Sequence, residues 1–540
     1  MINKKYIYLI LFCIALVYYG FRINVHTWET YYYTGCLDSF IHVQDMKPPT
    51  LKLSLPYEKL ICLHYTQHPI LYCVTYMICK YFFALKDGLV IVQLLNILSG
   101  IVGCFISYQV CLSLSQSRLL SVCLMLIVAF SDIYWYQCLS GEVYIQPFVF
   151  LVLSYYFLVN PEIFENERSN CKQVVYTSFA AGCAMSFHMF SALFYIVILY
   201  YLFELKKKNT NFKLQFMTGI SVFIMTIFFC FTYVIPYVII FEPNTISDWF
   251  QIVFLHTHNR GIWHVPLKFV IFETIWSFFI GTKHLLHAFV SGFSLFAIIT
   301  RLIILFICCY SVWNFIFRDK EKKIEKKILL VWFITYFFFI TINVPMVNDY
   351  WCFLIFPMVL FVILVLQQHI KMNYLIYALV LAICLMMSIN FIDDIFPKNK
   401  IRQEDFFILT KEEKSIENIN HIVMLGNKSL LSELWYIHQK YERKKVYYHA
   451  PDLQFKSNND FLESFKSLAA RIDENNFLLI LDGTSRDVVR SSRLIKKLGI
   501  KFEKLFNISR EYQVNELKTS IGITENPIMI TLYGFRLTKS

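Results

Sequence analysis

Long apolar runs, separated by short polar connections, constrain the fold of this chain more than any other feature. With 57% hydrophobic and 16% charged residues, and a mean hydropathy of +0.52, the chain carries more apolar surface than a water-soluble core can bury. We therefore predict a mostly α-helical, polytopic membrane protein with about 11 spans, since each span needs about 20 apolar residues. The spans are expected near 1–21, 89–112, 119–136, 143–159, 174–187, 189–203, 214–240, 296–317, 328–342, 350–366 and 374–391.

The first apolar segment, 1–21, has the outline of a signal peptide but lacks a small-x-small cleavage site, because RINVHTW follows it. We interpret it as an uncleaved first span with Lys4 and Lys5 in the cytoplasm. The loop that follows this span is then external.

The net charge of +12 lies largely in the connections between apolar segments, where the positive-inside rule places lysine and arginine on the cytoplasmic side. This pattern indicates membrane topology and argues against nucleic-acid binding. It also requires 69–83 and 267–295 to lie along the outer surface as interfacial elements. The basic connections, which fall on the side of Lys4, carry Arg118, Arg168 with Lys172, Lys206 to Lys208 with Lys213, Arg318 to Lys327, and Lys371.

Polar chemistry is concentrated in the first external loop, 24–88, which contains Glu29, Asp38 and the pair His68 and Pro69. A carboxylate held among aromatic residues at the outer face can act as a general base that takes a proton from an acceptor hydroxyl or amine. A loop of this length also carries acids that are merely solvated. Likewise, a proline after a histidine can simply begin a helix, so the residues alone leave these alternatives open.

Two arginines are candidates for binding an anionic ligand near the outer interface. Arg301 lies a few residues inside the apolar segment 296–317, and ionisable residues at such depth are candidates for function. Arg260, together with Lys283, lies in the other long external region and is an alternative to Arg301. The alternative for Arg301 is that its side chain only extends to the interface.

The composition changes after residue 396, which predicts a membrane domain over 1–396 and an extramembrane α/β domain over 397–540. Gly426 and Gly483 each end an expected strand, as glycines of phosphate-binding loops do, but no GxGxxG or GxxxxGKS motif is present. Ordinary strand-to-helix turns explain these glycines better. Strands are expected at 421–426, 445–450, 477–483 and 528–535.

The 16 cysteines lie before residue 385 and lack the spacing of metal ligands. Most are expected to be small apolar fillers within the spans. Cys36 and Cys62 both fall in the predicted external loop and could pair there, which the sequence alone does not establish. No cluster of ligands identifies a metal site, and a divalent metal cofactor stays an open possibility.

The order Asp38-Ser39, then HPILYCVTYMICKYF from His68, then the apolar stretch that contains SGEVY at 140–144, resembles the N-terminal half of the GT-C glycosyltransferases. It is most similar to the branch that uses polyprenyl-phosphate sugars, which includes protein O-mannosyltransferases and aminoarabinose transferases. The resemblance covers about residues 1–200 and continues weakly around His188 and Trp351. It implies Asp38 as the general base, with Glu29 as the alternative.

In substrate binding, the resemblance implies roles for His68, Pro69, Glu142 and Tyr144. The sequence departs from the family pattern in three places: Ser39 follows Asp38 where an acidic pair is common, Glu142 stands near where many relatives have arginine, and the late span lacks the arginine that often precedes its tyrosine-rich start. The last two departures concern the contact with the donor's phosphate.

The resemblance implies transfer of a sugar from a polyprenyl-phosphate donor to a glycan, lipid or protein acceptor, outside the inner membrane of a bacterial cell. A multi-span transporter or flippase is the alternative, although such proteins often contain repeated halves with broken helices and no internal repeat is apparent here. A non-catalytic assembly or receptor protein is a third possibility. It would use the C-terminal domain for binding and would not need the acidic loop.

Overall fold

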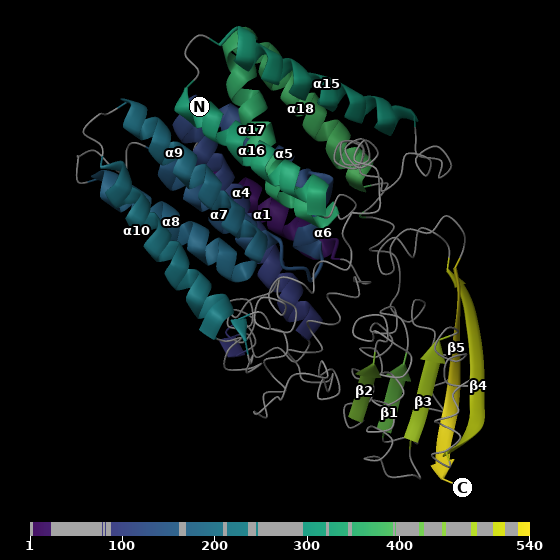
Figure 1. Cartoon of the computed structure of the whole chain (residues 1–540). Helices are drawn as coiled ribbons and strands as arrows, with labels where there is room; N and C mark the ends of the chain where they lie inside the picture. Colours follow the sequence, from purple (N-terminus) through teal and green to yellow (C-terminus); the bar gives the residue numbers. More distant parts are fainter. Residues whose placement is uncertain are drawn as a thin grey trace.

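The computed structural model describes residues 4–22, 78, 81–82, 88–160, 169–208, 213–235, 245–246, 295–319, 323–343, 348–391, 395, 421–425, 445–449, 477–482, 500–512 and 528–539. Most of these residues are helical and form one bundle, and the remainder include a five-stranded sheet (Figure 1).

In each apolar segment predicted to span the membrane, most of the described residues are helical. The helices are α1 (Lys4–Gly20), α4 (Gly88–Ser115), α5 (Arg118–Phe130), α6 (Asp132–Leu139), α7 (Ile145–Val159), α8 (Ser169–Phe187), α9 (Phe194–Lys208), α10 (Leu214–Phe229), α15 (Leu295–Phe317), α16 (Ile324–Asn343), α17 (Cys352–His369) and α18 (Met372–Asn390). Short turns of other helix types precede or follow three of them: η3 (Met189–Leu193), η4 (Cys230–Val234) and η6 (Asn348–Trp351).

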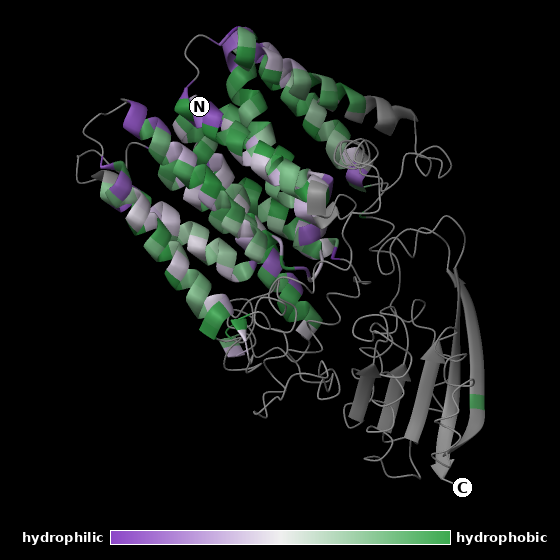
Figure 2. Ribbon diagram, viewed as in Figure 1, coloured by the Kyte–Doolittle hydropathy of each residue, from purple (hydrophilic) through white to green (hydrophobic). Residues whose placement is uncertain are grey.

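The apolar helices are those of a multi-pass membrane protein. In the described part, 4 helices are long and apolar enough to cross a membrane, or up to 5 if the bent pair α5 and α6 counts as one span. The predicted number of about 11 spans therefore stays a prediction. Hydrophobic residues run along the helices, and hydrophilic residues gather mainly near their ends (Figure 2).

The core of the bundle is built around α5, α7 and α17, most of whose residues are buried. Helix α7 packs between α4 and α8, and α17 packs against α15 and α16. Aromatic rings fill the centre: Trp332 lies 5.9 Å from Tyr155 and 5.8 Å from Phe356, measured between ring centroids. Buried aromatic side chains contribute large contact areas in defined geometries, and these rings fix how α7, α16 and α17 meet.

Helix α9 ends in three lysines, and α16 carries two lysines in its first turn. These helix ends are called the basic end of the bundle below, and the N-terminus lies near them (Figure 1). Lys327 on α16 forms an ion pair of 2.8 Å with Glu204 on α9. Lys326 pairs with Asp319 across the connection between α15 and α16, and both of these side chains are buried. Removing one partner of a buried ion pair is costly, so these contacts hold α9, α15 and α16 together at this end.

Helices α5 and α6 are bent by 61° at Ser131, within a segment predicted as one continuous span. The break frees backbone carbonyl groups, which must find other donors within a membrane. Tyr18 Oη donates to the Ala129 carbonyl at 2.6 Å, and Asn390 Nδ2 donates to the Phe130 carbonyl at 2.8 Å. Side chains from α1 and α18 therefore stabilise the bend, which directs α6 and the loop after it.

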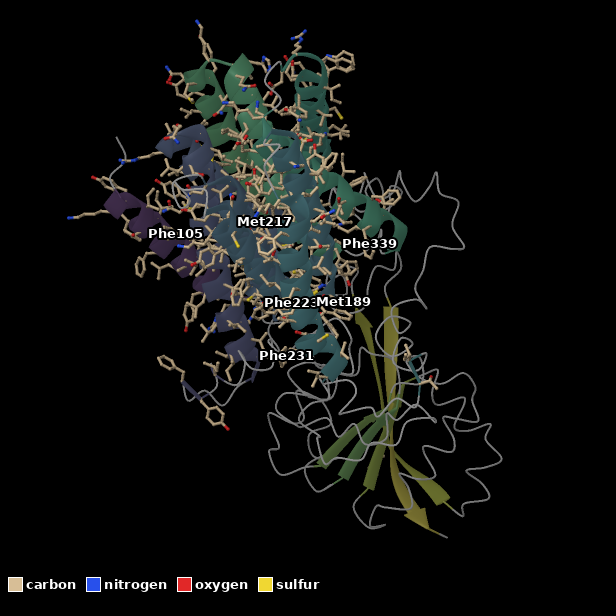
Figure 3. All side chains as sticks on the ribbon, turned by 60° about the vertical axis from the view of Figure 1, so that its left-hand side comes forward. Phe105, Met189, Met217, Phe223, Phe231 and Phe339 are labelled. Atoms are coloured by element: carbon tan, nitrogen blue, oxygen red, sulfur yellow. The ribbon has the colours of Figure 1, made fainter. Side chains whose placement is uncertain are left out.

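Helices α8 and α10 pack closely through small and polar residues, as helices in membranes often do. Ser178 and Ser221 lie 2.7 Å apart between their hydroxyl oxygens, and Ser186 and Thr232 lie 2.8 Å apart. The ring of Phe228 lies directly over Gly182. Phe223 on α10 and Phe231 on the adjoining η4 lie along this helix towards its C-terminal end (Figure 3). They are 66% and 64% exposed, so they can face lipid.

The C-terminal strands form a mixed sheet in the order β2-β1-β3-β5-β4. Strand β1 (His421–Leu425) pairs in parallel with β2 (Lys445–His449) and β3 (Phe477–Asp482). Strand β5 (Ile528–Lys539) pairs antiparallel with β3 and with β4 (Ile500–Tyr512). Four strands thus lie where the sequence predicts them, and β4 is one that it did not predict. The helices expected between them and the domain boundary after residue 396 lie outside the described residues.

Candidate functional site

Three connections meet at the end of the bundle opposite the basic end. They are the loop 140–144 between α6 and α7, His188 between α8 and η3, and η6 before α17. The ring of Tyr144 lies 5.2 Å from the ring of His188 and 5.2 Å from that of Tyr350, measured between centroids. Phe190 and Phe353 complete this group, and the five residues are called the aromatic cluster below. Phe190 lies 4.4 Å from Tyr350, and Phe353 lies 6.0 Å from His188.

His188 is held in one orientation at the centre of the aromatic cluster. Its side chain is buried, and its Nδ1 accepts a hydrogen bond of 3.2 Å from the backbone N–H of Phe190. An imidazole that accepts through Nδ1 is neutral and carries its proton on Nε2. Burial lowers the pKa of His188 to about 3, because desolvation disfavours the charged form. His188 is therefore neutral near pH 7 and caps η3 instead of exchanging protons with solvent.

Glu142 lies in the loop 140–144 and is buried, with 2% of its surface exposed. Its backbone N–H donates to the Ser140 hydroxyl at 3.3 Å, and its carbonyl accepts from Asn96 on α4. Tyr144 follows in the same loop and is also buried. The structure thus places Glu142 and Tyr144, both predicted to bind substrate, in one fixed loop next to the connections that carry His188 and Tyr350.

The other predicted site residues are not described. Arg301 belongs to the first part of α15, and its side chain lies outside the described part of the chain. No three His, Cys, Asp or Glu side chains within the described ranges lie together as a metal site requires. Outside those ranges lie the predicted base Asp38, its alternative Glu29, and the binding residues His68, Pro69 and Arg260.

His188, Tyr350 and Asn96 belong to this end of the bundle but received no role from the sequence. A signal for two of them was present, because Asn96 and His188 are polar residues in otherwise apolar stretches, and such residues often have a function in membrane proteins. Their partners lie far away in the sequence, which is why the pattern alone did not bring them together.

No family model and no curated protein sequence matches the chain. Solved structures do match it. ArnT from Cupriavidus metallidurans bound to undecaprenyl phosphate has a TM-score of 0.54 and 9% identity, with 98% of this chain and 97% of that chain covered. The Archaeoglobus fulgidus oligosaccharyltransferase in its apo form has a TM-score of 0.52 and 12% identity, with 94% and 73% covered. The same organism's AglB, in complex with an inhibitory peptide and a dolichol-phosphate, has a TM-score of 0.52 and 12% identity, with 92% and 73% covered.

Proposed function

Because the chain has the fold of the GT-C glycosyltransferases ArnT and AglB, we propose that it is a membrane glycosyltransferase. It transfers a sugar from a polyprenyl-phosphate donor to a glycan, lipid or protein acceptor. The observation that carries this proposal is the match to ArnT, which covers 98% of this chain and 97% of that chain, in a structure that contains undecaprenyl phosphate. The order of the acidic loop and the SGEV loop in the sequence supports it independently.

In the proposed reaction, Asp38 removes the proton from the acceptor's hydroxyl or amine while the acceptor attacks the anomeric carbon of the sugar. The bond between that carbon and the phosphate oxygen breaks, and the polyprenyl phosphate leaves with the electron pair. Arg260 and Arg301 stabilise the departing phosphate, since guanidinium groups bind phosphate through paired hydrogen bonds. Glu142 and Tyr144, with His68 and Pro69, position the substrates.

We place the reaction on the outer side of the cell inner membrane. The basic end of the bundle then faces the cytoplasm with the N-terminus, as the positive-inside rule requires. The aromatic cluster faces outwards, and the domain over 397–540 lies in the periplasm or outside the cell. A lipid-linked donor suits this side of the membrane, because nucleotide sugars are confined to the cytoplasm.

A transfer assay on the purified protein in lipid nanodiscs tests this function, with labelled polyprenyl-phosphate sugars as donors. Asp38→Asn is expected to lower kcat by about 100-fold or more, the usual contribution of a general base, while donor binding persists. Glu29→Gln serves as the matched control and should cost less. A larger loss in Glu29→Gln would make Glu29 the base. Movement of intact lipid-linked sugar across a bilayer, without cleavage of the donor, would instead establish a flippase.

A further inference from the structure

Buried amide side chains lie beneath the loop that carries Glu142. Gln93 and Asn96 extend from α4, and Gln146 extends from the first turn of α7. Each of the three is at most 4% exposed. Amides are unusual so deep in apolar helices, because burying a polar group is unfavourable unless it is hydrogen-bonded.

Asn96 is the centre of this amide group. Its Nδ2 donates to the carbonyl of Ser140 at 2.8 Å, to the carbonyl of Gln137 at 3.2 Å, and also to the carbonyl of Glu142. Its Oδ1 accepts from Gln146 Nε2, which orients the amide. Gln93, which precedes Asn96 by about one turn of α4, donates from its Nε2 to the Leu139 carbonyl at 3.0 Å. The end of α6 and the loop after it are therefore attached to α4 at four carbonyl groups.

These hydrogen bonds restrict the loop more strongly than they would in water. A carbonyl that loses its donor in an apolar environment keeps the full cost of desolvation. Small shifts of the loop would leave several groups unpaired at once, so Glu142 and Tyr144 have one favoured position. The position of Tyr144 in turn sets its ring contacts with His188 and Tyr350.

We propose that Asn96 is a positioning residue for substrate, acting through the loop that carries Glu142 and Tyr144. This inference rests on the proposed glycosyltransferase function. Asn96 fixes the loop, and the loop holds the sugar and the acceptor in line for transfer. A misplacement of about 1 Å can lower a rate about 100-fold, which is why a residue without substrate contact can matter for the reaction.

The chain contains a matched control at the other end of α7. Gln173 on α8 is also a buried amide, and its Nε2 donates to the carbonyls of Phe157 and Leu158 at 3.0 and 2.9 Å. It attaches the end of α7 to α8 near the basic end of the bundle. Its loss should weaken the fold as the loss of Asn96 does, but it lies at the opposite end of α7 from Glu142.

The test compares Asn96→Ala and Gln173→Ala in the nanodisc transfer assay, with rates divided by the amount of folded protein. Asn96→Ala is expected to lower kcat/KM about 10- to 100-fold, mainly through kcat. Gln173→Ala should stay within about twofold of the wild type, the range usual for an independent distant site. Equal losses in both variants would show that Asn96 has only a structural role.

A double-mutant cycle then tests whether Asn96 acts through the loop. If it does, Asn96→Ala added to Glu142→Gln should cost far less than it costs alone, because residues that act together are not additive. If Asn96→Ala does not fold, Gln146→Met replaces it in both experiments. This substitution removes the hydrogen bond that orients Asn96, while the side chain at position 146 keeps nearly the same volume. Additive losses would overturn the inference, whereas a wild-type protein that transfers no sugar would overturn the proposed function itself.

Discussion

His188 shows how the fold sets the chemistry of a single residue at the proposed site. An exposed histidine titrates near neutral pH, whereas burial keeps the imidazole of His188 neutral. Its Nδ1 is occupied by the Phe190 N–H, and Tyr144 and Tyr350 lie beside its ring. The residue therefore joins three connections as a packed ring and leaves the proton transfer of the proposed reaction to a carboxylate.

The lowered pKa of His188 predicts sensitivity to acid. Between the ordinary histidine pKa and a value of about 3, the unfolded chain binds a proton that the folded protein excludes. The contribution of neutral His188 to the free energy of unfolding is thus fully present above about pH 6.5. It falls as the pH drops, by up to about 1.4 kcal/mol per pH unit. His188→Asn keeps a capping side chain but does not titrate, so its Tm should fall less between pH 7 and pH 5 than that of the wild type. Equal falls in both proteins would contradict this role.

The predicted site residues follow from the sequence to different extents. Glu142 and Tyr144 were reached by resemblance, and the structure places them together because they share one short loop. The role of Asn96 depends on partners more than 40 residues away along the chain. The role of His188 depends on ring contacts with residues of two other connections, Tyr144 and Tyr350. Such long-range contacts leave no local pattern in the sequence. Asp38 stays a prediction.

The length of the apolar segments predicted where the helices lie in the sequence, but not where a helix bends. The sequence predicts one span over 119–136, and the structure divides it at Ser131. The bend depends on donors from Tyr18 and Asn390, which no local pattern reveals. Strand β4 was missed for a related reason: its alternation of apolar and polar residues is interrupted where the register shifts between Lys504 and Phe506, and an extra residue in a strand breaks the period of two.

The contact between α8 and α10 predicts opposite outcomes for two glycines. A Cβ at position 182 would collide with the ring of Phe228, whereas one at position 219 would meet no atom within 4 Å. Gly182→Ala should separate the helices, strain the bonds from Ser178 and Ser186, and cost about 1 to 3 kcal/mol. Gly219→Ala should be neutral or stabilising by up to about 1 kcal/mol, since alanine favours a helix. Thermal unfolding of both variants in detergent measures the difference, and similar shifts would argue against close packing at Gly182.

For the whole molecule, the predicted GT-C resemblance is confirmed as a likeness of fold that extends over nearly all of the chain, well beyond the first 200 residues that suggested it. The prediction of a mostly helical, multi-pass membrane protein holds as well. Composition decided only the second point, because apolar runs of this length are typical of membrane spans. The GT-C resemblance rested on the order of Asp38, His68 and the SGEVY loop. The number of spans and the side on which the C-terminal domain lies depend on the position of the membrane. The sequence indicates that position only through the basic connections.

Topology is therefore the prediction that belongs to this scale. Reporter fusions at Lys207 and Lys322 should be active only in the cytoplasm, since both lie in basic connections. A fusion at Ser457, within the C-terminal domain, should be active only on the outer side. Two reporters are fused at each position, one active only in the cytoplasm and one active only outside. The reporter that stays inactive is thereby controlled for expression by the one that is active. A cytoplasmic signal at Ser457 would contradict the predicted topology of about 11 spans with the C-terminal domain outside.

The bend between α5 and α6 also bears on how the membrane domain is made. Asn390, which donates to the Phe130 carbonyl, follows it by 260 residues along the chain. The ribosome therefore releases α5 long before it has synthesised this donor. A backbone carbonyl without a donor is unfavourable in lipid, so we expect the bent arrangement of α5 and α6 to become fully stable only after α18 has been inserted. We then expect α18 to complete the bend, and chains that stop before Asn390 should be recognised by the cell as incompletely folded.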